Sequence, residues 1–220
     1  LILSSQILLA SISVGVFYKI NKLFFSEKVS LFGSLLFSLF PLHVYACAQI
    51  SSISLHIFLA ILFYYYFFQI AMKGNLKSIL IFAFIAGLLI LTRREFIAIL
   101  VLSSLFLFLF YKIPKKNILL IVLITMVTIS PYLIRNILIF DKIIIQAGFG
   151  YNVWKANNPN AKVEGSTVID DNLQKQIDKV AKDKFYRINE DKIFFNEGIK
   201  YIIEEPKRYL ILYLKKIASF

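Results

Sequence analysis

Three arginines stand beside long apolar segments of the chain, where a charged side chain needs a specific partner. Arg93 and Arg94 interrupt the run "LLILTRREFIAIL", and Arg135 follows "TISPYLI". A guanidinium group presents a rigid fork of N–H donors that matches phosphate oxygens, and ionised residues at membrane depth are functional candidates by default. We therefore predict that Arg93, Arg94 and Arg135 bind the phosphate of a lipid whose tail stays in the bilayer. The alternative is that Arg93 or Arg94 pairs with Glu95 and extends to the interface.

Aromatic and amide side chains gather in the segment 148–159, "GFGYNVWKANNP". Flat aromatic faces beside amide donors and acceptors suit a pyranose ring, and the glycines permit close backbone approach. We predict a loop that closes over a sugar or an acceptor, with contacts from Tyr151, Asn152, Trp154, Asn157 and Asn158. The alternative is an ordered loop that caps a bundle of membrane helices, with Asn-Pro forming a turn.

The remaining reactive side chains give weaker signals. Cys47 is the single cysteine, so an intrachain disulfide is excluded and it offers no metal cluster by itself. His43 and His56 lie thirteen residues apart on neighbouring apolar segments and have no acidic residue nearby. We interpret both histidines as packing residues and predict no metal ligands, although a divalent metal as a cofactor is left open.

The elements that position these residues are apolar. Hydrophobic residues make up 59% of the 220-residue chain, above the roughly 45–50% of soluble domains. A helix needs about 20 apolar residues to cross the bilayer core. Six segments predict such helices, at residues 1–18, 30–48, 54–71, 78–92, 95–111 and 118–137. Because the charges of "LTRREF" are costly in lipid, we place a tight re-entrant corner between the fourth and fifth segments.

Charge divides the chain into a membrane region, 1–137, and a largely aqueous region, 138–220. The first holds 11 Lys and Arg residues against 2 Asp and Glu, and the second holds 14 against 11. Lysines gather in alternate gaps of the membrane region, at 19–29, 72–77 and 112–117, and this asymmetry assigns those gaps to the cytoplasm. The net charge of +12 therefore orients the spans and does not indicate a nucleic-acid partner.

On the opposite side of the membrane we place residues 49–53 and the arginine corner. Residues 138–207 are predicted to lie on that side too, and so to be extracytoplasmic. Apolar residues recur every three or four positions from Asp170 to Ile203, which predicts two amphipathic helices. Pro206 ends the second helix, and 207–218 is expected to form another helix at or entering the membrane. The chain begins at Leu1 inside an apolar segment, so we interpret it as an internal fragment of a longer membrane protein.

The stretch "SPYLIRNILIFDKIIIQAGFGYNVWKANNPNA" resembles the GT-C superfamily of membrane glycosyltransferases, in particular the family thirty-nine or protein-mannosyltransferase-like group that includes aminoarabinose transferases. That family has a Pro-Trp-x-x-Arg-Asn span end followed by Gly-x-Asn-Leu-Trp-x-Gly-Asn-Asn-Pro. The matching positions here are Pro131, Arg135, Asn136, Gly150, Asn152, Trp154, Asn157, Asn158 and Pro159. Upstream, "AGLLILTRREF" is similar to the family's Gly-Leu-x-x-Leu-Thr-Arg-Pro corner, with Arg94 in the place of proline.

The resemblance implies an all-α transmembrane bundle of GT-C type with a small extracytoplasmic region of helices and loops. It also implies glycosyl transfer from a polyprenyl-phosphate-linked donor to a lipid, glycan or protein acceptor on the outer face of the cytoplasmic membrane. The family's catalytic acid lies in a loop after its first span, which would precede Leu1, so we name no catalytic residue. The alternative is a multi-span transporter or lipid flippase, which the scarcity of acids and broken helices in the spans disfavours.

Overall fold

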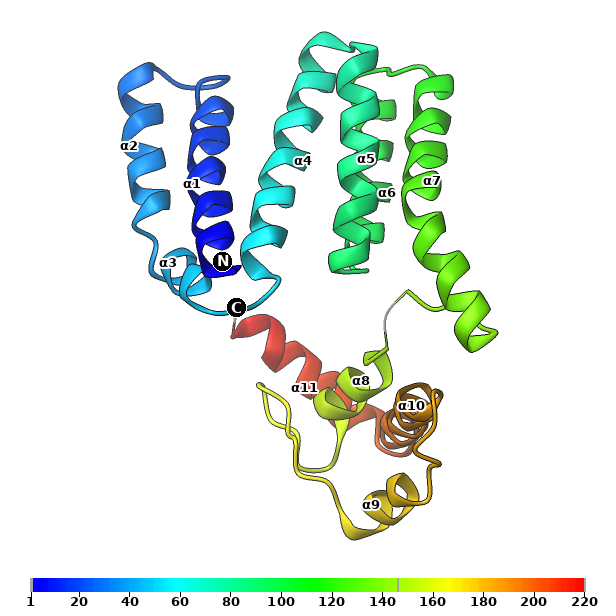
Figure 1. Ribbon diagram of the computed structural model, residues 1–220. Helices are drawn as coiled ribbons and strands as arrows, with labels where there is room; N and C mark the ends of the chain where they lie inside the picture. Colours follow the sequence, from blue (N-terminus) through cyan, green and yellow to red (C-terminus); the bar gives the residue numbers. More distant parts are fainter. Residues whose placement is uncertain (1, 146, 220) are drawn as a thin grey trace. The chain divides into compact units, whose positions relative to one another are not determined.

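The computed structural model describes residues 2–145 and 147–219 as a chain of helices, with one isolated bridge between Lys162 and Gly165. The all-α prediction is confirmed for these residues. The helices, labelled in Figure 1, are α1 (Ile2–Asn21), α2 (Glu27–Ser38), α3 (Pro41–Ala48), α4 (Ile53–Lys73), α5 (Leu76–Thr92), α6 (Phe96–Phe110), α7 (Lys115–Phe140), α8 (Phe149–Asn157), α9 (Asp171–Asp178), α10 (Tyr186–Glu204) and α11 (Pro206–Ala218).

The chain forms two compact units, Leu1–Ile134 and Arg135–Phe220, and the boundary falls within α7. In the first unit the long helices run up and down beside one another (Figure 1). Leucine, isoleucine and phenylalanine dominate these helices, and a helix satisfies every backbone donor and acceptor internally, as hydrocarbon surroundings require. Many of these side chains face outward, as expected of a lipid-facing surface.

All six predicted spans are helical, but they are not equally able to cross a membrane. By length and composition, α1, α4 and α7 can do so, and α2 with α3 counts as a fourth crossing if the pair is one broken span. The predicted span at 30–48 is divided between two helices, and the pair bends by 49° where Pro41 begins α3. Proline cannot continue the hydrogen bonding of α2, so it starts a new helix. The shorter α5 and α6 have 17 and 15 residues.

The core of the first unit lies around α5. Phe63 of α4 and Phe82 of α5 are fully buried, with ring centroids 4.4 Å apart. On another side of α5, Thr125 of α7 donates a hydrogen bond to the backbone oxygen of Ala83 over 3.1 Å. Gly87 allows this approach, because a Cβ there would lie 2.6 Å from that of Thr128. These contacts fix the position of the end of α5, where the arginine corner begins.

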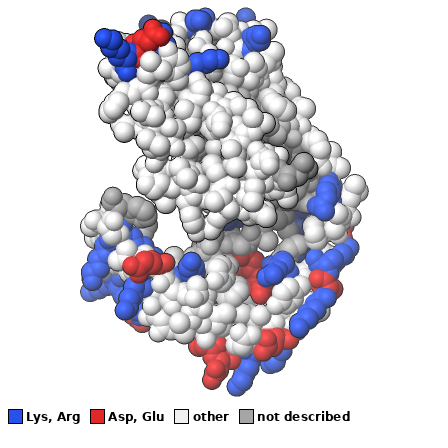
Figure 2. Space-filling view, turned by 60° about the vertical axis from the view of Figure 1, so that its left-hand side comes forward, with Lys and Arg blue, Asp and Glu red and all other residues white. Residues whose placement is uncertain are grey.

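Lysines occupy one end of the first unit, and Figure 2 shows blue side chains there beside a broad uncharged surface. Lys19 and Lys73 lie in the last turns of α1 and α4, and Lys115 begins α7. The turn between α4 and α5 is tight, because Gly74 adopts a left-handed conformation and the Asn75 side chain accepts a hydrogen bond from the Ser78 amide over 2.7 Å. The helix order therefore brings the lysine-rich gaps together.

The second unit has its own core, formed by Trp154, Leu173, Ile177 and Phe194. Two amphipathic helices were predicted between Asp170 and Ile203, and α9 and α10 confirm them. Asp170 begins α9 by accepting a hydrogen bond from the Leu173 amide over 2.8 Å. Pro206 separates α10 from α11 as the sequence predicted. The core thus joins α8, α9 and α10 into one packed unit.

Candidate functional site

The arginine corner joins α5 to α6 within three residues, Arg93, Arg94 and Glu95. The Arg93 amide donates a hydrogen bond to the Leu89 carbonyl oxygen over 2.8 Å, and its side chain is exposed. The Arg94 side chain is half-buried. The backbone of this corner is therefore fixed by helix α5, while the Arg93 side chain remains exposed.

A contact from α4 holds the corner. Nδ1 of His56 lies 3.0 Å from Oγ1 of Thr92, the last residue of α5, and this hydroxyl also donates to the Leu89 carbonyl oxygen. The His56 ring makes an edge contact with Phe96 at 5.0 Å between centroids. Sequence reasoning interpreted His56 as a packing residue, and the structure shows that it links α4 to both helices of the corner.

Arg135 belongs to the second unit, whereas Arg93 and Arg94 belong to the first. Its Nη1 donates to Oδ1 of Asn136 over 3.0 Å, and the side chain is exposed. The buried Asn136 donates in turn to the Ile144 carbonyl oxygen over 2.6 Å. Each arginine is thus placed within its own unit, and a phosphate site shared by all three stays a prediction.

The segment expected to be a loop is largely a helix, α8, and this corrects the sequence interpretation. Gly148 precedes the helix with a left-handed φ of 104°. The glycines and asparagines suggested a loop, but Tyr151, Val153 and Trp154 form an apolar surface that packs against α10. Tertiary packing of this kind outweighs a poor intrinsic helix propensity.

The five predicted sugar contacts differ in their accessibility. Trp154 and Asn158 are both 1% exposed. The Trp154 ring lies 4.9 Å from that of Phe194, and Asn158 donates to the Ser166 carbonyl oxygen over 2.7 Å while accepting from the Asn160 amide. The faces of Trp154 are therefore covered by the protein, and Asn158 orders the following turn.

Only part of the predicted set faces solvent. Asn157 is half-buried and donates to the Val153 carbonyl oxygen over 2.8 Å, within its own helix. Asn152 is exposed, and Tyr151 lines a pocket. The structure therefore separates the five residues into Tyr151 and Asn152, which can meet a ligand, and three residues engaged by the fold.

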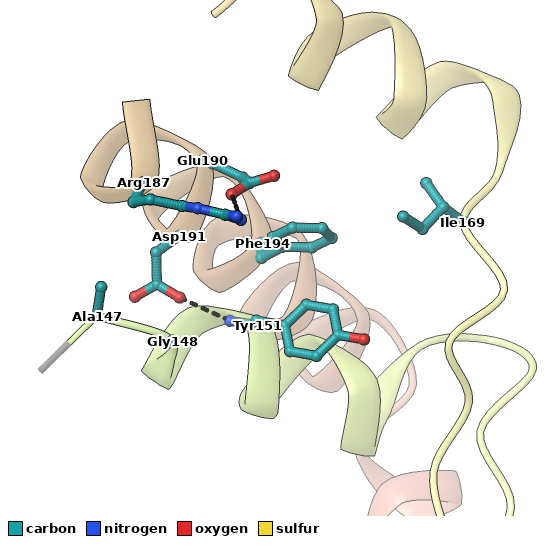
Figure 3. A pocket seen from close by; sticks show the side chains of 8 residues that line it. All are labelled: Ala147, Gly148, Tyr151, Ile169, Arg187, Glu190, Asp191 and Phe194. Carbon is teal, nitrogen blue, oxygen red and sulfur yellow. Dashed lines mark hydrogen bonds and ion pairs between the residues drawn. The ribbon is translucent and has the colours of Figure 1, made fainter. Parts of the chain in front are cut away.

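The pocket beside Tyr151 has a volume of about 410 Å³ and lies between α8 and α10. Figure 3 shows the rings of Tyr151 and Phe194 on one side and the carboxyl groups of Glu190 and Asp191 near them. Ile169 contributes from the segment before α9. Aromatic walls with a few polar groups are typical of sites for small molecules.

Each acidic side chain of the pocket has a defined partner. Glu190 forms an ion pair with Arg187 at 3.0 Å, and its other oxygen accepts a hydrogen bond from the Tyr186 hydroxyl over 3.2 Å. Burial first, and then this hydrogen bond to Glu190, raises the pKa of Tyr186. Asp191 accepts a hydrogen bond from the Tyr151 amide over 2.9 Å, close to the N-terminus of α8. Sequence reasoning missed these acids because they resembled the polar face of an amphipathic helix.

Metal ligands were not predicted from the sequence. In the described part of the chain, no three His, Cys, Asp or Glu side chains are grouped as metal ligands would be.

The apolar helices of the first unit and the polar second unit define a multi-pass membrane protein that is all helical in its described residues. The family model of dolichyl-phosphate-mannose-protein mannosyltransferases matches residues 2–134, which is more than half of the chain. The chain therefore belongs to this family of membrane glycosyltransferases, and the resemblance seen in its motifs is confirmed. No curated protein and no solved structure matches the chain.

The family match contains the arginine corner at 93–94 and ends just before Arg135. The assignment consequently depends on the helices of the first unit. The motif residues from Arg135 to Pro159, which carried much of the resemblance in the sequence, lie outside the matched range.

Proposed function

We propose that the protein takes part in transferring a glycosyl residue from a polyprenyl-phosphate-linked donor to a lipid, glycan or protein acceptor on the outer face of the cytoplasmic membrane. The family match over the first unit is the observation that carries this proposal. Lysines at one end of that unit support a cytoplasmic assignment of that end. The arginine corner lies at the opposite end of α5 from the lysine-rich gap at 72–77 and is therefore assigned to the outer side.

In this proposal Arg93 and Arg94 bind the phosphate of the donor. Breaking the sugar–phosphate bond leaves additional negative charge on the phosphate, and fixed cationic donors stabilise that charge as it develops. The hydrogen bond between His56 and Thr92 keeps the backbone of the corner in place, so little reorganisation is needed during the reaction. Arg135, in the second unit, is a further phosphate-binding candidate.

The second unit would receive the sugar or the acceptor. Tyr151 and Phe194 offer ring faces, and the carboxylates of Glu190 and Asp191 can accept hydrogen bonds from sugar hydroxyl groups. Asn152 lies on the same helix as Tyr151 and is exposed. Trp154, Asn157 and Asn158 would then act by holding α8 and the turn after it in shape.

Transfer assays on the purified full-length protein test the donor site. With radiolabelled polyprenyl-phosphate mannose as the donor probe, Arg93→Lys and Arg94→Lys should each reduce transfer, because an ammonium group cannot reproduce the two parallel donors of a guanidinium. The double Ala variant should reduce transfer further at normal membrane expression. Lys115→Ala is the matched control, since it removes a cation from the opposite end of the first unit.

Unchanged donor kinetics in the double Ala variant would reject the phosphate role of the corner. Topology is tested separately by cysteine labelling of intact cells with an impermeant maleimide. Positions 157 and 179 should react and positions 73 and 115 should not. The reverse pattern would overturn the assignment of the two sides.

A further inference from the structure

One ring nitrogen of His56 takes no part in holding the arginine corner. The ring lies against both residues that flank the corner, because Nδ1 contacts the Thr92 hydroxyl over 3.0 Å and the ring meets Phe96 edge-on with 5.0 Å between centroids. The His56 side chain is half-buried. Its other nitrogen, Nε2, forms no hydrogen bond with any described residue, and it is not enclosed in the protein as the ring nitrogens of His43 are. Nε2 is therefore open to a ligand at the corner.

The Thr92 hydroxyl determines which nitrogen of His56 carries the proton. A hydroxyl group has one hydrogen, and Thr92 donates it to the Leu89 carbonyl oxygen over 2.8 Å. The contact with His56 must then be a hydrogen bond from Nδ1–H to Oγ1 of Thr92. Because a neutral imidazole has a single N–H, Nε2 carries a lone pair and acts as an acceptor.

The charges that act on this ring come from the corner itself. Arg93 and Glu95 carry opposite charges, and both interact with His56. These surroundings do not impose the ionised form, and an ordinary imidazole is mostly neutral above about pH 7. The neutral ring therefore offers the lone pair of Nε2 to a donor group.

An acceptor nitrogen selects among the chemical groups of a lipid-linked sugar. The phosphate is ionised and presents only acceptor oxygens, so it suits the guanidinium of Arg93 and not the lone pair of Nε2. The prenyl chain is apolar. The hydroxyl groups of the sugar are the donors of the molecule, and the sugar is bonded directly to the phosphate. A phosphate at the corner thus brings these hydroxyl groups to the side on which His56 lies.

We propose that Nε2 of His56 accepts a hydrogen bond from a hydroxyl group of the donor sugar beside the arginine corner. This role rests on the proposed function, and it adds a ligand contact to the part that His56 plays in holding α4 against α5. The bare polyprenyl phosphate that remains after transfer lacks the sugar, so it loses this hydrogen bond. His56 therefore distinguishes the glycosylated carrier from the spent carrier and favours release of the latter.

Asparagine and glutamine separate the two nitrogens of His56. An asparagine amide can take the place of Nδ1, so His56→Asn keeps a donor for Thr92 and removes the acceptor at Nε2. The longer glutamine brings its amide oxygen to the place of Nε2. His56→Phe is a second variant without the acceptor, and it preserves the ring that packs against Phe96.

Binding of two carriers to the purified full-length protein tests the contact. The probes are undecaprenyl-phosphate mannose and undecaprenyl phosphate, without acceptor, at about pH 8, where a phosphate monoester is ionised. Loss of one neutral hydrogen bond should weaken binding of the mannosylated carrier by about 5-fold in His56→Asn and in His56→Phe. Binding of the bare carrier should stay within about 2-fold of the wild type, which also shows that the corner is folded. His56→Gln should recover part of the preference for the mannosylated carrier.

The failure of this inference differs from the failure of the proposed function. Equal weakening of both carriers in His56→Asn and His56→Phe, or no change for either carrier, would overturn the hydrogen bond to the sugar. Arg93→Ala is the comparison variant, and it should weaken both carriers because both have the phosphate. If Arg93→Ala and the Arg93, Arg94 double Ala variant bind both carriers as the wild type does, the phosphate role of the corner is wrong, whereas the ratio between the two carriers still reports on His56.

Discussion

Gly150 provides a sharp test of how the second unit is built. A Cβ atom at this position of α8 would overlap the carbonyl oxygen of Asp191 and lie 2.8 Å from the backbone nitrogen and the Cβ of Phe195. All these atoms belong to α10 and most are backbone, so they cannot move aside as a flexible side chain would. Gly150→Ala should therefore push α8 away from α10.

The expected magnitude follows from opposing effects. Replacing glycine by alanine inside a helix stabilises by about 1 kcal/mol. Forcing the added methyl group between α8 and α10 lowers the free energy of unfolding by about 1–3 kcal/mol. Displacing α8 also weakens the hydrogen bond from the Tyr151 amide to the Asp191 carboxylate, and such charged bonds contribute about 1.5–3 kcal/mol. We expect a net destabilisation of about 2–4 kcal/mol, or a lowering of the unfolding midpoint by about 10 °C or more.

Trp154 reports this change without a label. It is the single tryptophan of the chain, and it is 1% exposed in the core of the second unit. Its fluorescence emission should shift to longer wavelength as that unit unfolds, and the Gly150→Ala transition should occur at lower temperature. Gly15→Ala in α1 is the control, because a Cβ there has no neighbour within 4 Å and the Trp154 transition should not move. A Gly150→Ala protein as stable as the wild type would refute the close packing of α8 and α10.

Further predictions concern the same unit. Burial first, and then the carboxylate of Asp170, raises the pKa of Tyr201 from the ordinary 10.0 to about 12. Between pH 10 and 12 the folded state therefore keeps this proton while the unfolded state loses it, so the stability of the unit should fall as the pH rises. The stability of the Tyr201→Phe protein, measured by Trp154 fluorescence, should fall less over the same pH range. Asn158→Ala should destabilise the unit by about 1–3 kcal/mol, because it leaves buried partners unpaired. Asn152→Ala changes an exposed position, so the free energy of unfolding reported by Trp154 should stay within about 0.5 kcal/mol of the wild type. A loss of transfer activity in this stable variant would indicate a ligand contact. Equal losses of stability and of transfer would argue against such a contact.

The helices of the first unit could be predicted because their apolar runs are long and because charges end them. Residues Lys19, Lys73 and Arg93 each lie at or beside the helix end that the sequence indicated. The bend at Pro41 was missed because an apolar run alone gives no sign of how a proline within it is accommodated. The sequence predicted the arginine corner for the same reason that it predicted the spans.

The second unit was harder, because its site depends on contacts between distant residues. Trp154 and Tyr151 are three residues apart and both aromatic, yet one is buried in the core and the other lines the pocket. That difference arises only when α10 packs against α8. Glu190 and Asp191 likewise gain their positions from Gly150 and Gly198, where the two helices touch through their backbones. No local pattern specifies which pair of helices will meet.

The lengths of α4 and α5 bear on the proposal that the arginine corner binds a lipid-borne phosphate. Helix α4 has 21 residues, whereas α5 has 17. At about 1.5 Å per residue, α5 is roughly 6 Å shorter, about one helical turn. The two helices are joined by the tight turn of Gly74 and Asn75. The last residue of α5, Thr92, therefore lies about one helical turn short of the first residue of α4, Ile53. The contact of His56, three residues inside α4, with Thr92 at the end of α5 agrees with this offset. Arg93 therefore follows α5 about one turn before the level of the first residue of α4. In the proposed function, a phosphate attached to a prenyl chain would approach this recessed position along the chain's own path through the bilayer, whereas a water-soluble nucleotide sugar would have to enter the membrane.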